Sequence, residues 1–161
     1  MRLRRLLLFG IAPLMLAQAP APTVLRAQYE WGYAGADGEG QGTLSILLEA
    51  ATGRLVLELH GLGERLVFLQ GSRAEGYRVQ MPRRGVDRTA PELGSLPLPF
   101  LPAIGTPEAL AKLLREGAGP GVTVSKRDKW GPVKLSYRGQ DEGGKRVQVW
   151  LTRVRWEDGT P

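Results

Sequence analysis

Residues 25–33 run Leu-Arg-Ala-Gln-Tyr-Glu-Trp-Gly-Tyr, with an apolar or aromatic side chain at every second position. Arg26, Gln28 and Glu30 fall between them. Successive side chains of an extended chain point to opposite faces of a sheet, so this period of two predicts a strand with one buried and one solvated face. The same alternation recurs along much of the chain, and that recurrence decides the fold class.

The alternation continues through residues 44–50, 55–60 and 77–81, and residues 66–69 are continuously apolar. Short segments that contain glycine separate these runs. Such spacing is typical of an antiparallel meander. The most glycine-rich segment, residues 36–42, is expected to be a turn. It does not indicate nucleotide binding, because no Gly-Lys-Ser/Thr follows and a strand comes next.

A proline-containing stretch interrupts the strands. Residues 82–95 are polar and predict a loop, and residues 96–102, Leu-Pro-Leu-Pro-Phe-Leu-Pro, are apolar but too rich in proline for regular structure. Thr106 before Pro107 predicts the start of a helix, with Thr106 as its N-cap, and Gly117 predicts its end.

Strands resume after this helix, beginning at residues 122–124 and continuing through residues 133–138 and 146–156. In the last of these, Val147, Val149 and Leu151 fall on one face. Trp150, Val154 and Trp156 fall on the other face, so this strand is expected to be buried on both sides.

These elements predict an α+β protein. The expected fold is a mostly antiparallel sheet that forms an open, unclosed β-barrel or a strongly curved sheet, covered by the short helix and the Pro-rich apolar segment. A chain of 161 residues, 42% of them hydrophobic, has the size and composition of one domain with its own core.

The N-terminus predicts a signal sequence over residues 1–21. Three arginines lie within residues 1–5, residues 6–17 are almost wholly apolar, and small residues follow. This apolar run is shorter than the roughly 20 residues that a membrane-spanning helix needs. The sequence Ala17-Gln18-Ala19 fits a cleavage site, but proline follows it, so the boundary is placed only between residues 17 and 27. We therefore expect export to the periplasm or cell envelope, with residues 22–161 forming a single β-rich domain.

Composition limits the partners. The chain has no cysteine, which excludes disulfides, thiolate metal sites and a lipid anchor attached through cysteine. The net charge of +6 falls to +3 without the three leader arginines, so nucleic-acid binding is not expected. Basic residues are enriched over residues 126–155, which indicates either a solvated strand surface or a face suited to an anionic membrane surface.

No catalytic residues, metal site or cofactor site are predicted. His60 is the only histidine and has neither a nucleophile motif nor further metal ligands beside it. Glu49 with Glu58, which flank one predicted hairpin, or Asp141 with Glu142 could form a pair of glycosidase carboxylates. Hairpin charges that face solvent and are opposed by Arg54 explain Glu49 and Glu58 better. The protein is therefore expected not to be an enzyme.

The chain instead has a surplus of apolar residues. If the helix and the Pro-rich segment cover the apolar face of the sheet completely, the face is an ordinary core; if they cover it incompletely, it is a pocket for acyl chains. For such a pocket we expect Leu57, Val79, Trp150 and Trp156 to line or border the site. Phe100 and Leu101 would then lie on its movable cover.

Three stretches resemble the bacterial lipoprotein-localisation family of LolA and LolB. They are the meander over residues 42–81 with its Gly-Leu-Gly turn at residues 61–63, the segment 96–101 that leads into a helix, and residues 129–137 with the strand over residues 146–156 that follows them. The resemblance is one of element order and hydropathy. It implies an open antiparallel barrel, lidded by helices, with an apolar cavity for the acyl chains of lipoproteins. The chain is shorter than usual members, and the absence of cysteine favours a soluble carrier over a receptor.

The expected function is therefore that of a non-enzymatic periplasmic or envelope protein that binds a lipid or an acylated protein in an apolar cavity. The alternative is a structural or protein-interaction module of the cell envelope with a filled core.

Overall fold

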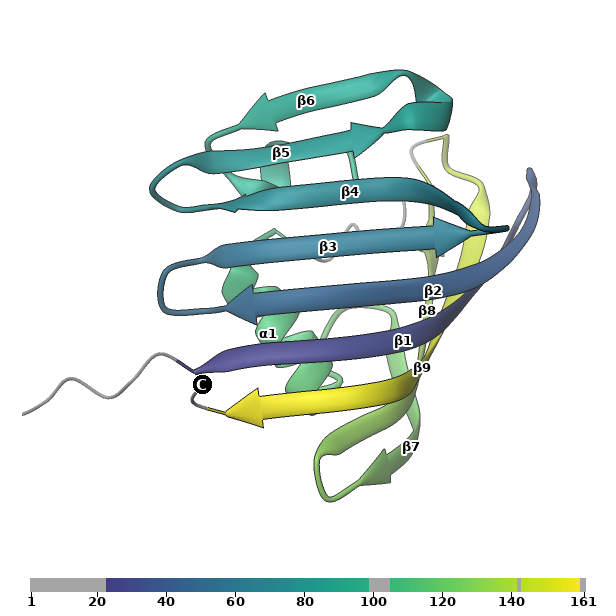
Figure 1. The fold of residues 1–161 in the computed structure, drawn as a ribbon. Coiled ribbons are helices and arrows are strands. Elements are labelled where there is room, and N and C mark those ends of the chain that lie inside the picture. The colour runs from purple at the N-terminus through teal and green to yellow at the C-terminus, as the bar shows by residue number, and fades with distance from the viewer. Residues whose placement is uncertain (1–22, 99–104, 142, 160–161) are drawn as a thin grey trace, which may run out of the picture.

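The computed structural model describes residues 23–98, 105–141 and 143–159, which form one antiparallel sheet and one short α-helix (Figure 1). Two 3-10 turns, η1 (Pro82–Arg84) and η2 (Leu93–Ser95), flank β6, and the helix α1 spans Pro107–Glu116. The strands are β1 (Val24–Gly35), β2 (Gly38–Glu49), β3 (Arg54–Gly61), β4 (Glu64–Ser72), β5 (Gly76–Met81), β6 (Val86–Ala90), β7 (Val122–Asp128), β8 (Gly131–Gln140) and β9 (Arg146–Gly159).

The sheet order is β6-β5-β4-β3-β2-β1-β9-β8-β7. Strands β1 to β6 form one meander and β7 to β9 a second, and pairing between β1 and β9 joins the two. Within the described part of the chain β6 and β7 are unpaired edges, so the sheet stays open. The expectation of a mostly antiparallel, unclosed and curved sheet with one short helix is confirmed, although strands dominate more than an α+β label suggests.

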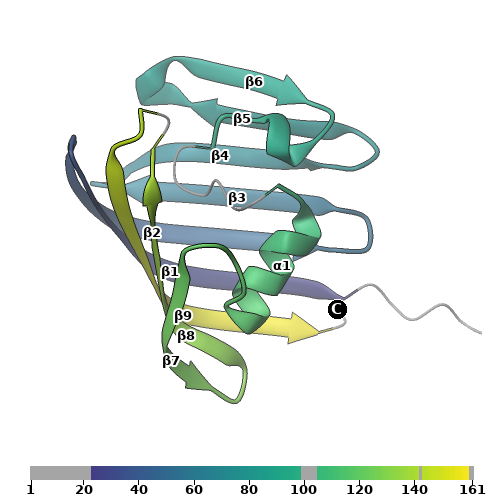
Figure 2. The same ribbon diagram turned by 180° about the vertical axis from the view of Figure 1, so that it is seen from behind.

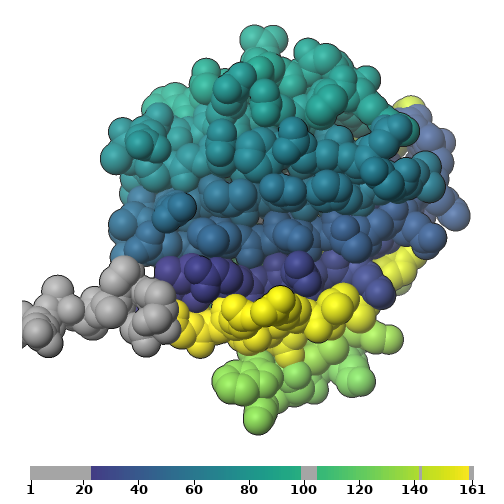
Figure 3. Space-filling model, in the orientation of Figure 1, coloured from purple at the N-terminus to yellow at the C-terminus, as the bar shows by residue number. Residues whose placement is uncertain are grey.

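The sheet curves around a concave face on which α1 lies (Figure 2). Figure 3 shows the opposite, convex face, on which the strands form parallel bands of side chains. Alternating burial follows from this arrangement: Leu25, Ala27, Tyr29 and Trp31 of β1 are buried on the concave side, while the residues between them are exposed. Each strand contributes a period-two stripe to one core, as the alternation predicts.

The helix begins and ends at the predicted residues. The Thr106 hydroxyl accepts a hydrogen bond from the Ala109 N–H at 3.1 Å, and Pro107 occupies the first turn, where its missing N–H costs nothing. Gly117 ends the helix with φ +70°, a left-handed conformation that glycine adopts without strain. Leu110 and Leu114 are buried against the sheet.

Two element boundaries differ from expectation. The expected turn at residues 36–42 is only Ala36-Asp37, because Gly38–Gly42 belong to β2. Two of these glycines have close neighbours: a Cβ on Gly40 would come within 3.3 Å of the Trp31 ring, and one on Gly42 would meet the His60 carbonyl. The expected loop at residues 82–95 contains β6, which a charged sequence without clear alternation concealed.

The edge strand β7 explains part of the basic enrichment. Lys126 and Arg127 are exposed on it, and irregularities in its pairing with β8 fall between Val124 and Arg127. Charged side chains and bulges on an edge discourage pairing with other chains.

Candidate functional site

The concave face is the candidate site, and one row of side chains crosses it from β9 to β5. Consecutive cross-strand partners in this row are Trp156–Ala27, Ala27–Ile46, Ile46–Leu57, Leu57–Leu69 and Leu69–Val79. Three of the six predicted site residues, Leu57, Val79 and Trp156, therefore lie in the same row. Leu57 is 7% exposed and Val79 fully buried, while Trp156 is half-buried and packs against the core from the edge of the face.

A β-bulge brings Trp156 to this face. The register between β1 and β9 shifts at Gln28/Tyr29, so that Tyr29 opposes Arg153 while Gln28 opposes Arg155. The extra residue in β9, Val154, reverses the alternation beyond it. The expectation that Trp150, Val154 and Trp156 share one face of β9 is therefore wrong, since Trp156 lies on the face of Leu151.

Trp150 lies away from Leu57 and Val79. It opposes Gly32, one position from the pair Trp31–Leu151, and so points to the other side of the sheet. Its side chain is 43% exposed, and its ring would lie 3.5 Å from a Cβ on Gly32. The expectation that β9 is buried on both faces is also wrong, because Trp150 and Val154 are both exposed.

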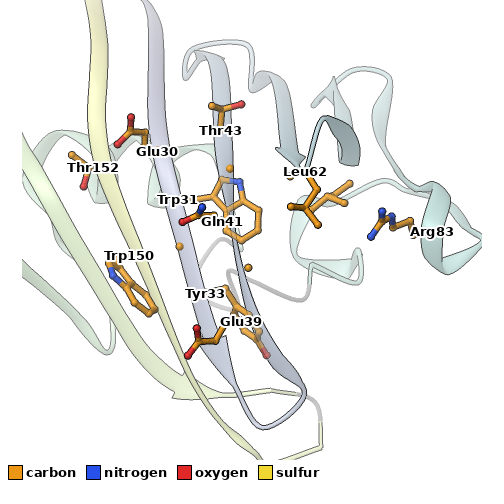
Figure 4. Close-up of a pocket in the computed structure, with 15 residues that line it drawn as sticks. Glu30, Trp31, Tyr33, Glu39, Gln41, Thr43, Leu62, Arg83, Trp150 and Thr152 are labelled. Carbon is orange, nitrogen blue, oxygen red and sulfur yellow. The ribbon is translucent and has the colours of Figure 1, made fainter.

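Trp150 instead lines a cleft of about 1080 Å³ at the end of the β1–β2 hairpin. Figure 4 shows Trp31 over this hairpin, Trp150 on the neighbouring β9 and Leu62 approaching from the β3–β4 turn. The Trp31 indole N–H donates to the His60 carbonyl at 2.8 Å, which ties the hairpin to β3. The cleft mixes acidic, amide and aromatic side chains and is not an extension of the apolar row.

Phe100 and Leu101, the remaining predicted site residues, lie outside the described residues. Next to that segment, Leu93 and Leu96 are buried and belong to the cluster that covers the concave face. The cover over β1 to β5 is thus made partly by η2 and the residues after it, and partly by α1.

A second row of side chains lies beside the row from Trp156 to Val79, and it contains two polar residues that the sequence analysis did not predict as site residues. Arg153, Tyr29, Leu44, Leu59 and Val67 are consecutive cross-strand partners. The Tyr29 hydroxyl and Arg153 Nη1 are buried and have no hydrogen-bond partner among the described residues. An available signal was the alternation Val147, Val149, Leu151, which continues to Arg153 and so places an arginine on the apolar face.

Arg153 is held at one end only. Its Nη2 donates to Asp128 Oδ2 at 2.5 Å, and its guanidinium lies 5.0 Å from the Trp156 ring centroid. The Arg153 side chain is 5% exposed and that of Asp128 43%, so the ion pair joins the buried face to the surface. The hydrogen bond from Arg153 holds the pKa of Asp128 below its ordinary value.

Glu49 and Glu58, considered for glycosidase chemistry, do not face each other. Glu58 of β3 opposes Ser45 of β2, whereas Glu49 of β2 opposes Arg54 of β3. Glu49 lies four residues beyond Ser45, which is about 13 Å at the rise of a strand. Glu49 accepts a hydrogen bond from the Thr52 hydroxyl at 2.8 Å, and Glu58 contacts His60 at 3.1 Å. Among the described residues no group of three or more His, Cys, Asp or Glu is placed to hold a metal ion.

No protein-family model matches the chain, and no curated protein matches it. In the described ranges no helix has the length and apolar character needed to cross a bilayer.

Proposed function

We propose that this protein is a non-enzymatic carrier that binds the acyl chain of a lipid or of an acylated protein along the concave face of its sheet. The observation that carries the proposal is the mismatch between a wide apolar face and a small helical cover. The ten residues of α1 give a cylinder about 15 Å long and about 10 Å wide.

The face beneath the helix is much larger. The six strands from β5 to β9 in sheet order span about 24 Å at the usual spacing, and the eight residues of β3 extend about 26 Å. The helix can therefore cover roughly a quarter of this area. Leu93 and Leu96, in and after η2, cover part of the remaining apolar surface, and in a carrier this cover is exchanged for the ligand.

One observation favours the alternative, a structural or protein-interaction module of the envelope with a filled core. Leu57, Leu69 and Val79 are each at most 7% exposed and belong to one continuous cluster. A carrier must open this packing when it binds, whereas a structural module keeps it closed.

The replacement Leu57→Trp separates the two functions. If the face exchanges its cover for an acyl chain, the mature wild-type chain binds a fluorescent fatty acid saturably, and Leu57→Trp stays folded but competes with the probe for the same space. If the core is filled, the wild type binds no probe and the larger side chain costs about 1–3 kcal/mol of stability through overpacking. Val56→Trp is the matched control, because Val56 is adjacent in sequence and points to the convex face.

We place this activity in the periplasm or cell envelope. The support is the order of features in residues 1–21: basic residues, then an apolar run, then small residues. An acyl chain needs such a carrier where it has to cross an aqueous compartment between membranes.

A further inference from the structure

Tyr29 and Arg153 form a polar pair inside an otherwise apolar face. They are direct cross-strand partners on β1 and β9, and such partners have Cβ atoms about 4.5–5.5 Å apart. Leu44 lies beyond Tyr29 in the same row, and the row of Trp156, Ala27 and Leu57 runs beside it. The pair thus lies at the β9 end of the surface where we place an acyl chain.

Both groups present an unused donor. The Tyr29 hydroxyl and Arg153 Nη1 lack a partner among the described residues, although each is buried. Leaving a buried donor unpaired costs stability, and a bound ion is one explanation for such a group.

The charge states suit an anion. Burial raises the pKa of Tyr29 above its ordinary value, and the nearby Arg153 charge only partly opposes this, so the phenol keeps its proton. Arginine stays protonated in proteins. Asp128 uses one nitrogen of the guanidinium, and the Trp156 ring holds the plane of the guanidinium in position.

We propose that Arg153 Nη1 and the Tyr29 hydroxyl bind the anionic oxygen head group of the acyl ligand, a carboxylate or a phosphate monoester, while its chain lies along the row through Leu57. This inference rests on the carrier function proposed above. Arginine is well suited to the task because its planar donors match carboxylate and phosphate oxygens.

Asp128 affects both the orientation of Arg153 and the strength of anion binding. Its carboxylate bonds the same guanidinium and repels a second anion placed nearby, so it weakens anion binding while it keeps Arg153 oriented. Since Asp128 is 43% exposed, Asp128→Asn removes this repulsion without burying a new polar group.

The test is displacement of a neutral fluorescent lipid probe by a fatty acid and by the fatty alcohol of the same chain length. We expect the acid to displace the probe from the wild type at a concentration about tenfold lower than the alcohol, the scale of one charge-assisted hydrogen bond in a buried site. Arg153→Met, shown by circular dichroism to be folded, should abolish this preference, and Asp128→Asn should increase it. Arg155→Met is the matched control, because Arg155 is an exposed arginine of the same strand that pairs with Glu157.

Two further ligands identify the source of the anion. A monoacyl phosphate is compared with the fatty acid of equal chain length. The ligand that displaces the probe at the lower concentration identifies the head group as a phosphate or a carboxylate. Inorganic phosphate should not displace the probe; if it does so as well as the acyl ligands, the site binds a free anion and the head-group assignment is overturned.

The outcomes separate the two proposals. If the neutral probe binds and the acid and alcohol displace it equally from the wild type, the anion site is wrong and the carrier function stands. If the probe does not bind the folded wild type at all, the carrier function fails. A preference for the acid that survives Arg153→Met also overturns the assignment of Arg153.

Discussion

Replacing Tyr29 by phenylalanine should stabilise the ligand-free protein. The Tyr29 side chain is 1% exposed, and its hydroxyl has no partner among the described residues. In the unfolded chain this hydroxyl is hydrated, so folding removes its bonds to water without replacing them. The penalty for such a group is about 1–3 kcal/mol. Because the phenyl ring keeps the packing, Tyr29→Phe recovers most of that penalty.

Tyr77→Phe provides the matched control. Tyr77 is also buried, at 3% exposed, but its hydroxyl donates to the Gly53 carbonyl at 2.8 Å. Removing this bond leaves a carbonyl unpaired and should cost about 1 kcal/mol. The two substitutions delete the same atom from two buried tyrosines, one without and one with a hydrogen-bond partner.

The assay is urea unfolding of both variants and the wild type, followed by fluorescence and circular dichroism. We expect opposite signs, with the unfolding free energy raised by about 1–2 kcal/mol in Tyr29→Phe and lowered in Tyr77→Phe. Each kcal/mol corresponds to about 2–4 °C in melting temperature at this chain length. If Tyr29→Phe destabilises the fold as much as Tyr77→Phe does, the Tyr29 hydroxyl is hydrogen-bonded in the folded state and is not free to bind an anion.

Three further predictions concern the sheet and the leader. Gly42→Ala should lower the unfolding free energy by at least about 1–3 kcal/mol, because the new Cβ would lie 1.8 Å from the His60 carbonyl oxygen. The control Gly159→Ala should leave the unfolding free energy unchanged in the same urea titration, because its Cβ would have no neighbouring atom within 4 Å. The hydrogen bonds from Arg78 and then Gln80 lower the pKa of Asp87 to about 2, so this carboxylate stabilises the fold above about pH 4 and ceases to do so as the pH falls through about 2. The stability difference between wild type and Asp87→Asn should therefore vanish over that interval; a constant difference would contradict the ion pair. Residues 1–27 fused to a reporter should carry it out of the cytoplasm, and a reporter retained there would refute the signal sequence.

The helix and the strand faces were predictable because local chemistry determines them. Thr106, Pro107 and Gly117 each satisfy a backbone requirement of a helix end without reference to the rest of the chain. The shared face of Leu57 and Val79 follows from period two in their own strands. Their place in a single row depends on register across β4, which the sequence of neither strand contains.

The errors arose where distant strands determine the outcome. The bulge beside Tyr29 exists only because β9 pairs with β1 across more than a hundred residues, and it reverses the face of Trp156. The glycines from Gly38 to Gly42 have turn composition, but they are strand residues that pair with β1, with the Trp31 ring beside Gly40 and the His60 carbonyl beside Gly42. The alternation within β9 places Arg153 on the apolar face, but its ion pair with Asp128 of β7 and its pairing with Tyr29 depend on distant strands.

Native mass spectrometry of residues 22–161, purified without detergent, tests the proposed carrier function most directly. We expect a population heavier than the apoprotein by the mass of one acyl-bearing molecule, released on collisional activation and depleted in Leu57→Trp but not in Val56→Trp. A single apoprotein mass that persists after incubation with fatty acid, from a chain shown to be folded by circular dichroism, would contradict it.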